Sequence, residues 1–475
     1  MATTLDFSSF YNVIDGKTST TAQASNNNVN PATLEPTPRV PLSTREDVDR
    51  AVEAARKAAV SWAAVPWEER REAIRKFADA IDENAEEFAK LLVMQQGKAP
   101  MWAKHEIASS TEWLRGLANL SIPVEVIEDT PDRKVISRYT PLGVAVGIVP
   151  WNFPVSLACA KLAPAILTGN AFIWKPSPFS PHCSLKVAEL GARFFPPGVL
   201  QVLSGDDTLG PLLTAHPGVN VVNFTGSVPV GKKIAETCSR SLKRFTLELG
   251  GNDAAIVCAD VDPVEVATKI GVVAFCNAGQ ICIAVKRLYV HEAVYDAVLA
   301  ALVGFAQSLK LGVEEDAFVG PVANKPQYER VLGLLAEIER ANLTLATGST
   351  RPVEGMKGYY IAPTVIDNPP EDSPIVAEEQ FAPILPVMKW SDESDVIRRA
   401  NGTELGLGAS VWTRDAEQGE RISNQLQAGN VWVNCHAELQ PNTPFPGHKE
   451  SGFGAEMGVE GLKAFCNVQA VYRRS

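Results

Sequence analysis

Short apolar runs alternate with segments of helical length over most of this chain, from residue 143 onward. In the first half, the runs lie at 143–149, 170–175, 199–203, 219–224 and 244–249. In the second half, they lie at 254–260, 287–292, 359–366, 384–390, 408–412 and 429–434. This alternation predicts βαβ units and parallel sheets. The expected fold class is therefore α/β, with two doubly wound parallel-sheet halves that join near Gly250.

The chain before residue 143 has a different pattern. The first forty residues are rich in Ser, Thr and Asn, which predicts an extended and weakly ordered segment. Ser43 and Glu46 fit a capping box, because apolar residues at helical spacing follow them. A second helical segment is expected over 66–95.

Residues 124–140 fit a two-stranded hairpin that turns at 130–132. The stretch that follows carries no charge from 139 to 160, which is long enough to cross a bilayer. Prolines and glycines interrupt it, however, so a buried parallel strand that runs into a loop explains it better. We expect no membrane partner.

Composition narrows the class of protein. A length of 475 residues suggests two or three domains. The net charge is −11 and no segment carries a basic stripe, which argues against a nucleic-acid partner. The eight cysteines are scattered without a CxxC pair, and the N-terminus lacks a basic region followed by an apolar run. These features indicate a reduced, cytoplasmic protein.

Cys282 lies just after a Gly-Gln turn and before an expected strand, in the segment FCNAGQICIA. A cysteine acts as a nucleophile only as the thiolate, which requires a polar and partly open site. An isolated cysteine is more often a buried core residue, so both interpretations stay open. A zinc pair with Cys276 is disfavoured because the spacing fits no common zinc pattern, and no metal site is expected.

Two other polar residues stand at expected strand ends. Glu248, within LELGG, lies where open α/β sheets bind ligands, so it can serve as a general base. Its alternative is an ion pair with Lys243 or Arg244. Asn152 is held between the prolines of PWNFP, which makes it either a rigid oxyanion donor or an ordinary turn residue.

A candidate phosphate site lies where one expected strand ends and a helix begins near Pro229. Gly226 and Ser227 stand at that junction, and the free N–H groups of a helix N-terminus favour an anion. The segment lacks the GxGxxG fingerprint, so it does not by itself indicate a dinucleotide. Lys175 ends another expected strand and fits a ribose or phosphate contact, the alternative being a solvated lysine.

A series of motifs along the chain resembles the aldehyde dehydrogenase superfamily. In order, these are PWNFP, WKPS, FTGS, LELGG, the GQxC cysteine, EQFAP at 379–383 and PFPGHKESGFG near the end. The resemblance implies a cofactor-binding domain at 1–123 and 142–249 and a catalytic domain at 250–446. It also implies a small β oligomerisation element at 124–141 and 447–475, and hence a homodimer or homotetramer.

The resemblance implies a reaction and its catalytic residues. An aldehyde is oxidised to the carboxylic acid with hydride transfer to NAD(P), through a thiohemiacetal and a thioester. Cys282 would be the nucleophile, Glu248 the base and Asn152 the oxyanion donor. Lys161 and Glu456 stand at positions that the family uses as a secondary proton path.

The resemblance also implies the cofactor contacts. Lys175 and Glu379 would hold the two riboses, Ser227 the pyrophosphate, and Phe381 would pack near the nicotinamide. The full expected set is Trp151, Lys175, Ser177, Gly226, Ser227, Glu379 and Phe381. Pro178 stands where NAD-preferring members often have a Glu, so we expect use of NAD with NADP tolerated.

The substrate pocket implied by the resemblance is apolar and consists of Phe153, Ala160, Ile281, Ile283, Leu439 and Phe445. Ala160 stands where many members have a Trp, and Leu439 where an aromatic is common. This set predicts a neutral, fairly bulky aldehyde as the partner molecule. Two alternatives remain: a relative that passes the thioester to coenzyme A, and a catalytically silent structural member of the family.

Overall fold

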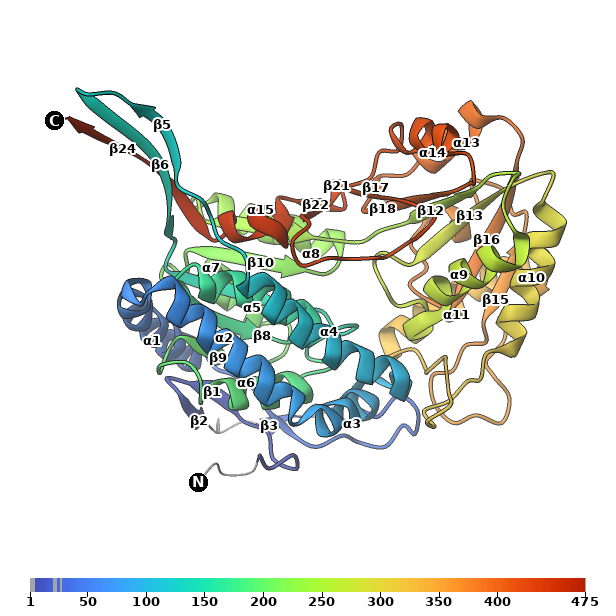
Figure 1. The fold of residues 1–475 in the computed structure, drawn as a ribbon. Coiled ribbons are helices and arrows are strands. Elements are labelled where there is room, and N and C mark those ends of the chain that lie inside the picture. Colours follow the sequence, from blue (N-terminus) through green and yellow to red (C-terminus); the bar gives the residue numbers. More distant parts are fainter. Residues whose placement is uncertain (1–4, 20–23, 26–27, 475) are drawn as a thin grey trace.

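The computed structural model describes residues 5–19, 24–25 and 28–474, which form a mixed α/β protein with two large sheets (Figure 1). The first sheet is eight-stranded, in the order β2-β1-β9-β8-β7-β10-β11-β22. Its strands are β1 (Asn12–Ile14), β2 (Lys17–Ser19), β7 (Val144–Ile148), β8 (Ala171–Lys175), β9 (Leu200–Val202), β10 (Val221–Thr225), β11 (Arg244–Glu248) and β22 (Gly452–Phe453). Strands β7 to β11 pair in parallel, and the other three pair antiparallel.

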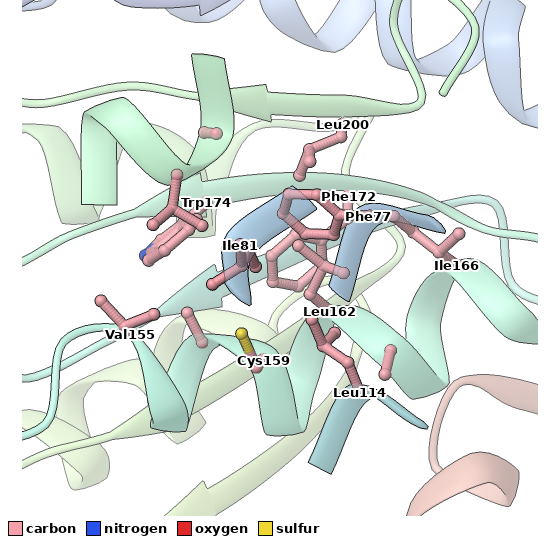
Figure 2. Packing of buried hydrophobic residues seen from close by; sticks show 14 of the residues in the cluster. Phe77, Ile81, Leu114, Val155, Cys159, Leu162, Ile166, Phe172, Trp174 and Leu200 are labelled. Atoms are coloured by element: carbon pink, nitrogen blue, oxygen red, sulfur yellow. The ribbon is translucent and has the colours of Figure 1, made fainter. Parts of the chain in front are cut away.

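Helices cover both faces of the first sheet. On one face lie α2 (Trp67–Asp82), α3 (Ala85–Gln96), α4 (Pro100–Ala118), α5 (Ser156–Leu167) and α6 (His182–Gly191). On the other lie α1 (Arg45–Ala64), α7 (Leu209–Ala215) and α8 (Val228–Ser239). Phe172 and Trp174 of β8 face the first group and Ile173 faces the second, because successive strand residues point to opposite faces. Figure 2 shows Phe172 and Trp174 gathered with Phe77 and Leu162 in this core.

The second sheet is seven-stranded, in the order β14-β15-β16-β13-β12-β18-β19. Its strands are β12 (Asp253–Val257), β13 (Val285–His291), β14 (Leu345–Thr347), β15 (Thr364–Asp367), β16 (Ile384–Trp390), β18 (Gly408–Trp412) and β19 (Asn430–Val433). All pairs are parallel except that of β14. Helices α9 (Pro263–Phe275) and α10 (Tyr295–Ser308) pack on one face. The other face carries α11 (Lys325–Arg340), α12 (Pro374–Ala377), α13 (Glu393–Ala400) and α14 (Ala416–Ser423).

A three-stranded sheet, in the order β24-β6-β5, reaches away from the rest of the molecule (Figure 1). β5 (Glu125–Asp129) and β6 (Arg133–Pro141) form the predicted hairpin, and β24 (Cys466–Arg474) pairs antiparallel along β6. The remaining short elements are β3 (Ala24–Ser25), β4 (Val40–Pro41), β17 (Leu405–Gly406), β20 (Phe445–Pro446), β21 (His448–Lys449), β23 (Ala455–Glu456), α15 (Gly458–Lys463) and the 3₁₀ helix η1 (Cys276–Gly279). Among the described residues, the helices include none that is long and apolar enough to span a membrane.

The predicted α/β class with parallel sheets is confirmed, but two predictions for the N-terminal part are wrong. The first forty residues are not merely an extended segment, because β1 and β2 form a hairpin and β1 pairs with β9. Residues 1–4, 20–23 and 26–27 of that prediction lie outside the described part. The capping box is formed by Thr44 and Asp47, one residue later than predicted. Ser43 instead donates to the carbonyl of Ser204, which ties it to the sheet.

Two predicted boundaries also differ from the structure. The helical segment over 66–95 is divided into α2, which ends with Glu83 as its C-cap, and α3, which begins after its N-cap Asn84. The run at 359–366 forms a strand only from Thr364. Pro363 precedes this strand and has no N–H to donate to a neighbouring strand, so the sheet begins after it.

Candidate active site

The polar residues predicted at the strand ends of the first sheet stand at one edge of that sheet. Asn152 follows β7, Lys175 ends β8, Ser227 follows β10 and Glu248 ends β11. These four strands are parallel neighbours, and the order reverses between β7 and β10. The crevice at such a reversal point is where open α/β sheets bind ligands.

Cys282 lies in a tight turn directly before β13 of the second sheet. Asn277, Ala278 and Gly279 take positive φ angles of 49°, 55° and 69°. A Cβ at Gly279 would stand 2.1 Å from the carbonyl oxygen of Ala382, so only glycine fits there. The backbone N–H of Gln280 donates to the carbonyl of Asn277 at 3.1 Å and closes the turn, and the side-chain Nε2 of Gln280 donates to the same carbonyl at 2.9 Å. The turn is buried, whereas the residue at its end, Cys282, is partly exposed.

Asn152 links the first sheet to this turn. Its side-chain Nδ2 donates to the carbonyl oxygen of Gln280 at 3.0 Å, two residues before Cys282. The backbone carbonyl of Asn152 accepts from Lys98 Nζ at 2.8 Å. Since an amide nitrogen has two hydrogens, one N–H of Asn152 is left for another acceptor. Asn152 is 3 % exposed, so its orientation is fixed by these contacts.

The Glu248 carboxylate is buried without compensation. Neither of its oxygens has a hydrogen-bond partner among the residues that the structure describes. Burial raises the pKa of this carboxyl well above its usual range, the nearby Glu456 adds to the rise, and Lys161 opposes it. Lys243 donates instead to the carbonyls of Thr214 and His216, so the ion pair considered from the sequence does not form.

Lys161 and Glu456 form a buried ion pair beside Glu248. The ammonium of Lys161 donates to the carboxylate of Glu456 and, at 2.6 Å, to the hydroxyl of Thr225. Their side chains are 0 % and 5 % exposed. Two charges removed from water are tolerable only when each compensates the other.

One cavity of about 390 Å³ joins these residues. Cys282, Glu248, Asn152 and Glu456 line it, whereas Lys161 lies behind Glu456 and is not in the lining. All of the predicted pocket residues also line it, namely Phe153, Ala160, Ile281, Ile283, Leu439 and Phe445. Its walls add aromatic and apolar side chains that the sequence did not suggest, namely Trp102, Trp113, Leu157, Val273 and Met457.

The thiol in this cavity is neutral at rest. Burial raises the pKa of Cys282 to about 12. Three nearby carboxylates add to this rise, and the positive charge of Lys286 opposes it. A neutral thiol requires a base or a nearby positive charge before it attacks. Glu248 lines the same cavity, and its raised pKa makes its carboxylate a stronger base than an ordinary carboxylate.

The residues expected to contact the cofactor do not line this cavity. Lys175 is buried, and burial lowers the pKa of its ammonium group to about 8. The negative charges of Asp207 and Asp206 act in the opposite direction and raise this pKa. Ser177 is buried as well, and its hydroxyl accepts from the N–H of Phe179 at 3.3 Å. Ser227 is exposed at the start of α8 and makes no side-chain cap. Pro229 has no N–H, so the N–H groups of Val228 and Val230 are the ones left open to an anion.

A second group of expected contacts stands near the Cys282 turn. Trp151 and Phe381 meet edge to face, with ring centroids 5.4 Å apart. Glu379 Oε1 accepts from the N–H of Gly251 at 3.1 Å. A Cβ at position 250 would stand 2.6 Å from Glu379 Oε2, so the double glycine makes room for this carboxylate. Gly226 donates to the carbonyl of Glu248 at 3.0 Å.

Comparison with known proteins decides the family. A model of the aldehyde dehydrogenase family matches residues 18–471. The chain belongs to this family. It is 38% identical to the aldehyde dehydrogenase LUC3 of a Fusarium species over 468 residues, which is 98% of this chain and 99% of the relative. It is 36% identical to a phenylacetaldehyde dehydrogenase of Pseudomonas fluorescens, over 93% of this chain and 91% of the relative.

Solved structures agree with this assignment. The NAD⁺ complex of an aldehyde dehydrogenase from Bacillus cereus superposes with a TM-score of 0.95 at 34% identity, over 98% of this chain and 96% of the other. A lactaldehyde dehydrogenase from Escherichia coli superposes with a TM-score of 0.94 at 32% identity, over 98% and 99%.

Sequence reasoning missed several residues that hold this aldehyde dehydrogenase site together. Lys98 and Glu106 form a fully buried ion pair, and Glu106 Oε1 accepts from the N–H of Val155 at 2.9 Å. Together with the contact from Lys98 to Asn152, this pair holds the PWNFP segment at its central residue and just after its end. Lys286 contacts the Cys282 turn. Two adjacent basic residues, Lys286 and Arg287, in a buried strand were a visible signal for Lys286, whereas nothing in the local sequence pointed to Lys98.

Proposed function

We propose that this enzyme oxidises an apolar aldehyde to its carboxylic acid with NAD, through a covalent intermediate on Cys282. The observation that carries the proposal is the shared cavity, where a thiol, an unpaired buried carboxylate and a fixed amide face one apolar space. Membership of the aldehyde dehydrogenase family supports the reaction class. Each of these groups has a distinct part in the chemistry.

The first half of the reaction depends on Cys282 and Asn152. The Cys282 sulfur attacks the aldehyde carbon, and its proton passes to Glu248 or to water in the cavity. Attack places negative charge on the former carbonyl oxygen, for which the second N–H of Asn152 and the backbone N–H of Cys282 are candidate donors. Bound NAD supplies the hydride acceptor that allows the adduct to become a thioester.

The second half depends on Glu248. A thioester on Cys282 is hydrolysed when a water molecule loses a proton as it attacks. The raised pKa of Glu248 suits that task, because a carboxylate of ordinary pKa is too weak a base. Lys161 and Glu456 lie beside it and can relay the proton away from the cavity.

The cofactor contacts follow from the strand ends of the first sheet. Lys175 and Ser177 would hold the adenosine ribose, and Ser227 with Gly226 the pyrophosphate at the start of α8. Glu379 would hold the second ribose, while Phe381 and Trp151 would pack near the nicotinamide. The open helix terminus and the buried Lys175 ammonium both fit an anionic dinucleotide. The Bacillus cereus relative was solved with NAD⁺, which supports the same ligand here.

The substrate proposed is a neutral, bulky aldehyde. Phe153, Phe445, Trp102 and Trp113 give the cavity aromatic walls, and no arginine lines the part of it that the structure describes. The imidazoles of His105 and His436 also line it, but burial lowers the pKa of His436 to about 3, so a carboxylate-bearing aldehyde would find no guanidinium or ammonium partner there. A relative of 36% identity is a phenylacetaldehyde dehydrogenase, which supports this class.

A spectrophotometric screen tests the proposal. Purified protein is supplied with NAD or NADP and with phenylacetaldehyde, aliphatic aldehydes and succinic semialdehyde, with and without coenzyme A. NADH formation without coenzyme A, fastest for the aromatic aldehyde, is the expected result. Dependence of turnover on coenzyme A would indicate a relative that passes the thioester to coenzyme A. Absence of turnover with every aldehyde would indicate a catalytically silent member of the family.

The domain roles are part of the same proposal. Residues 1–123 and 142–249 would bind the cofactor, 250–446 would carry the catalytic cysteine, and 124–141 with 447–475 would join subunits into a homodimer or homotetramer. The three-stranded sheet that reaches out from the molecule supports the last role (Figure 1). All eight cysteines are free, which supports a reducing compartment such as the cytoplasm.

A further inference from the structure

Lys286, the second residue of β13, points back onto the turn that carries Cys282. Its Nζ lies 2.6 Å from the carbonyl oxygen of Ile281 and 2.6 Å from that of Cys282, and it donates to both. The side chain is 3 % exposed. A buried ammonium that binds the carbonyl of the nucleophile itself fixes the backbone from which the thiol projects.

The same ammonium also reaches Glu379. Lys286 Nζ and Glu379 Oε1 are 3.5 Å apart. A lysine has three N–H donors, and two of them are engaged on the Cys282 turn, so the third is left for this carboxylate. The backbone carbonyl of Lys286 in turn accepts from the side chain of Gln380 at 3.3 Å. Lys286 is therefore joined to the Glu379–Gln380 segment through both its side chain and its backbone.

These segments are packed closely against one another. A Cβ at Gly251 would stand 2.4 Å from the carbonyl oxygen of Cys282, and one at Gly250 would stand 2.6 Å from Glu379 Oε2. The N–H of Gly251 also binds Glu379 Oε1. A movement of the Glu379 carboxylate therefore changes the surroundings of Lys286 at once.

We propose that Lys286 is a positioning residue that transmits ribose binding at Glu379 to the Cys282 thiol. This inference rests on the proposed function, in which Cys282 is the nucleophile and Glu379 contacts the cofactor ribose. When Glu379 turns toward ribose hydroxyls, the Lys286 ammonium loses its carboxylate partner. Its charge then acts more fully on the thiol, which favours the thiolate. The nucleophile becomes reactive when the cofactor is in place.

The charges around Cys282 determine the direction of the effect. Lys286 lowers the pKa of the thiol, whereas Glu379, Asp253 and Glu248 raise it, with burial as the largest cause of the rise. Removal of Lys286 leaves the three carboxylates without their opposing charge. The thiol should then be harder to ionise.

The first test is the rate of alkylation of Cys282 by iodoacetamide in the full-length protein, followed by mass spectrometry of the Cys282 peptide. Lys286→Met should slow alkylation about ten-fold at neutral pH and raise the midpoint of its pH profile by about one unit. Lys269→Met, at an exposed lysine paired with Glu265, is the matched control and should leave both unchanged. An unchanged midpoint in folded Lys286→Met would overturn the proposal.

The second test uses ADP-ribose, which carries the second ribose without the charged nicotinamide ring, and AMP, which lacks that ribose. In the wild type, ADP-ribose should accelerate alkylation about five-fold, or ~0.7 of a pKa unit, and AMP should not. In Lys286→Met the acceleration should fall below about two-fold. Equal acceleration in the two proteins, or none in the wild type, would refute the link.

A third variant covers the case in which Lys286→Met does not fold. Glu379→Gln keeps the side-chain shape but removes the charge that pairs with Lys286, so ADP-ribose should again accelerate alkylation less than about two-fold. An undiminished acceleration in this variant would contradict the proposal. Aldehyde turnover by the wild type is measured separately, because its absence would refute the proposed function and not the coupling of ribose to thiol.

Discussion

Glu248 and Cys282 line one cavity although they belong to different sheets. Glu248 is the last residue of β11 in the eight-stranded sheet, and Cys282 precedes β13 in the seven-stranded sheet. Burial raises the pKa of both groups, that of Cys282 to about 12 and that of Glu248 well above the usual carboxyl range. The thiol is therefore neutral at rest, and the Glu248 carboxylate in the same cavity is a stronger base than an ordinary carboxylate.

Cys282→Ala should abolish aldehyde oxidation while leaving NAD binding intact. The substitution removes the sulfur that forms the covalent intermediate and changes no proposed cofactor contact. Turnover of an aromatic aldehyde and quenching of protein fluorescence by NADH give the two measurements. Cys276→Ala is the matched control, because Cys276 is a second cysteine that lines the same cavity. Turnover near the wild-type level in Cys282→Ala would remove this cysteine from the mechanism.

Glu248→Gln should release about one NADH per active site in a burst and then turn over slowly. A carboxamide cannot accept the proton of the attacking water, so the thioester accumulates. Stopped-flow absorbance of NADH gives the burst, and mass spectrometry of the quenched protein gives the acyl adduct on Cys282. Steady-state turnover like that of the wild type would contradict the role of base. Loss of the burst would show that Glu248 also activates the thiol.

The pH dependence of kcat should follow the raised pKa of Glu248. A general base acts only after losing its proton, and burial together with Glu456 raises this pKa well above the usual carboxyl range. The rate of deacylation should therefore increase with pH and reach its plateau at a higher pH than a carboxyl of ordinary pKa would give. Initial rates at saturating aldehyde and NAD check this, and Glu248→Gln should flatten the profile. A wild-type profile that is flat from weakly acidic pH upward would show that the carboxyl titrates in its ordinary range.

Lys161→Met should destabilise the fold strongly. The substitution leaves Glu456 buried without its positive partner, which costs about 3–5 kcal/mol in the free energy of unfolding. Lys463→Met, which breaks the more exposed pair with Glu460, should cost about 0–1 kcal/mol. Urea denaturation of both variants against the wild type measures the difference. Equal effects would mean that the buried pair contributes no more than an exposed one.

The sequence predicted residues that line the cavity better than it predicted the contacts that hold them in place. Glu248 and Asn152 stand at or just after the carboxyl ends of parallel strands, which lie at one edge of the sheet. Cys282 precedes a strand of the other sheet, and its local pattern left its role open until the series of motifs indicated the family. Lys98 contacts the backbone carbonyl of Asn152, which is distant in the sequence. Lys286 contacts the backbone carbonyl of Cys282 in the turn just before its own strand. A hydrogen bond to a carbonyl requires no particular residue type in its acceptor, so it leaves no motif.

The N-terminal prediction failed for a related reason. A polar composition suggested a weakly ordered segment, yet Asn12 is fully buried and its side chain binds both Ser43 and Ser204. Pairing of β1 with β9 depends on a strand almost two hundred residues away. Such pairing between distant segments overrides the local preference for secondary structure, which depends only on neighbouring residues in the sequence.

The last prediction concerns the choice between NAD and NADP. NAD is usually selected by a carboxylate that binds the 2′-hydroxyl and repels a 2′-phosphate, but position 178 holds a proline that can do neither. We expect NAD to be preferred and NADP tolerated, with kcat/KM differing by at most about two orders of magnitude, or ~3 kcal/mol. Pro178→Glu should widen this preference.

The structure adds two carboxylates to this prediction. Asp207 and Asp206 act on the Lys175 ammonium and oppose the fall of its pKa. Asp206 is engaged in accepting from the N–H and hydroxyl of Thr208, which leaves Asp207 as the better candidate to repel a phosphate near Lys175. Asp207→Asn should therefore raise kcat/KM for NADP several-fold with little effect on NAD, measured at saturating aldehyde. Exclusive use of NAD that survives Asp207→Asn would show that another carboxylate excludes the phosphate, and the argument from Pro178 would be wrong.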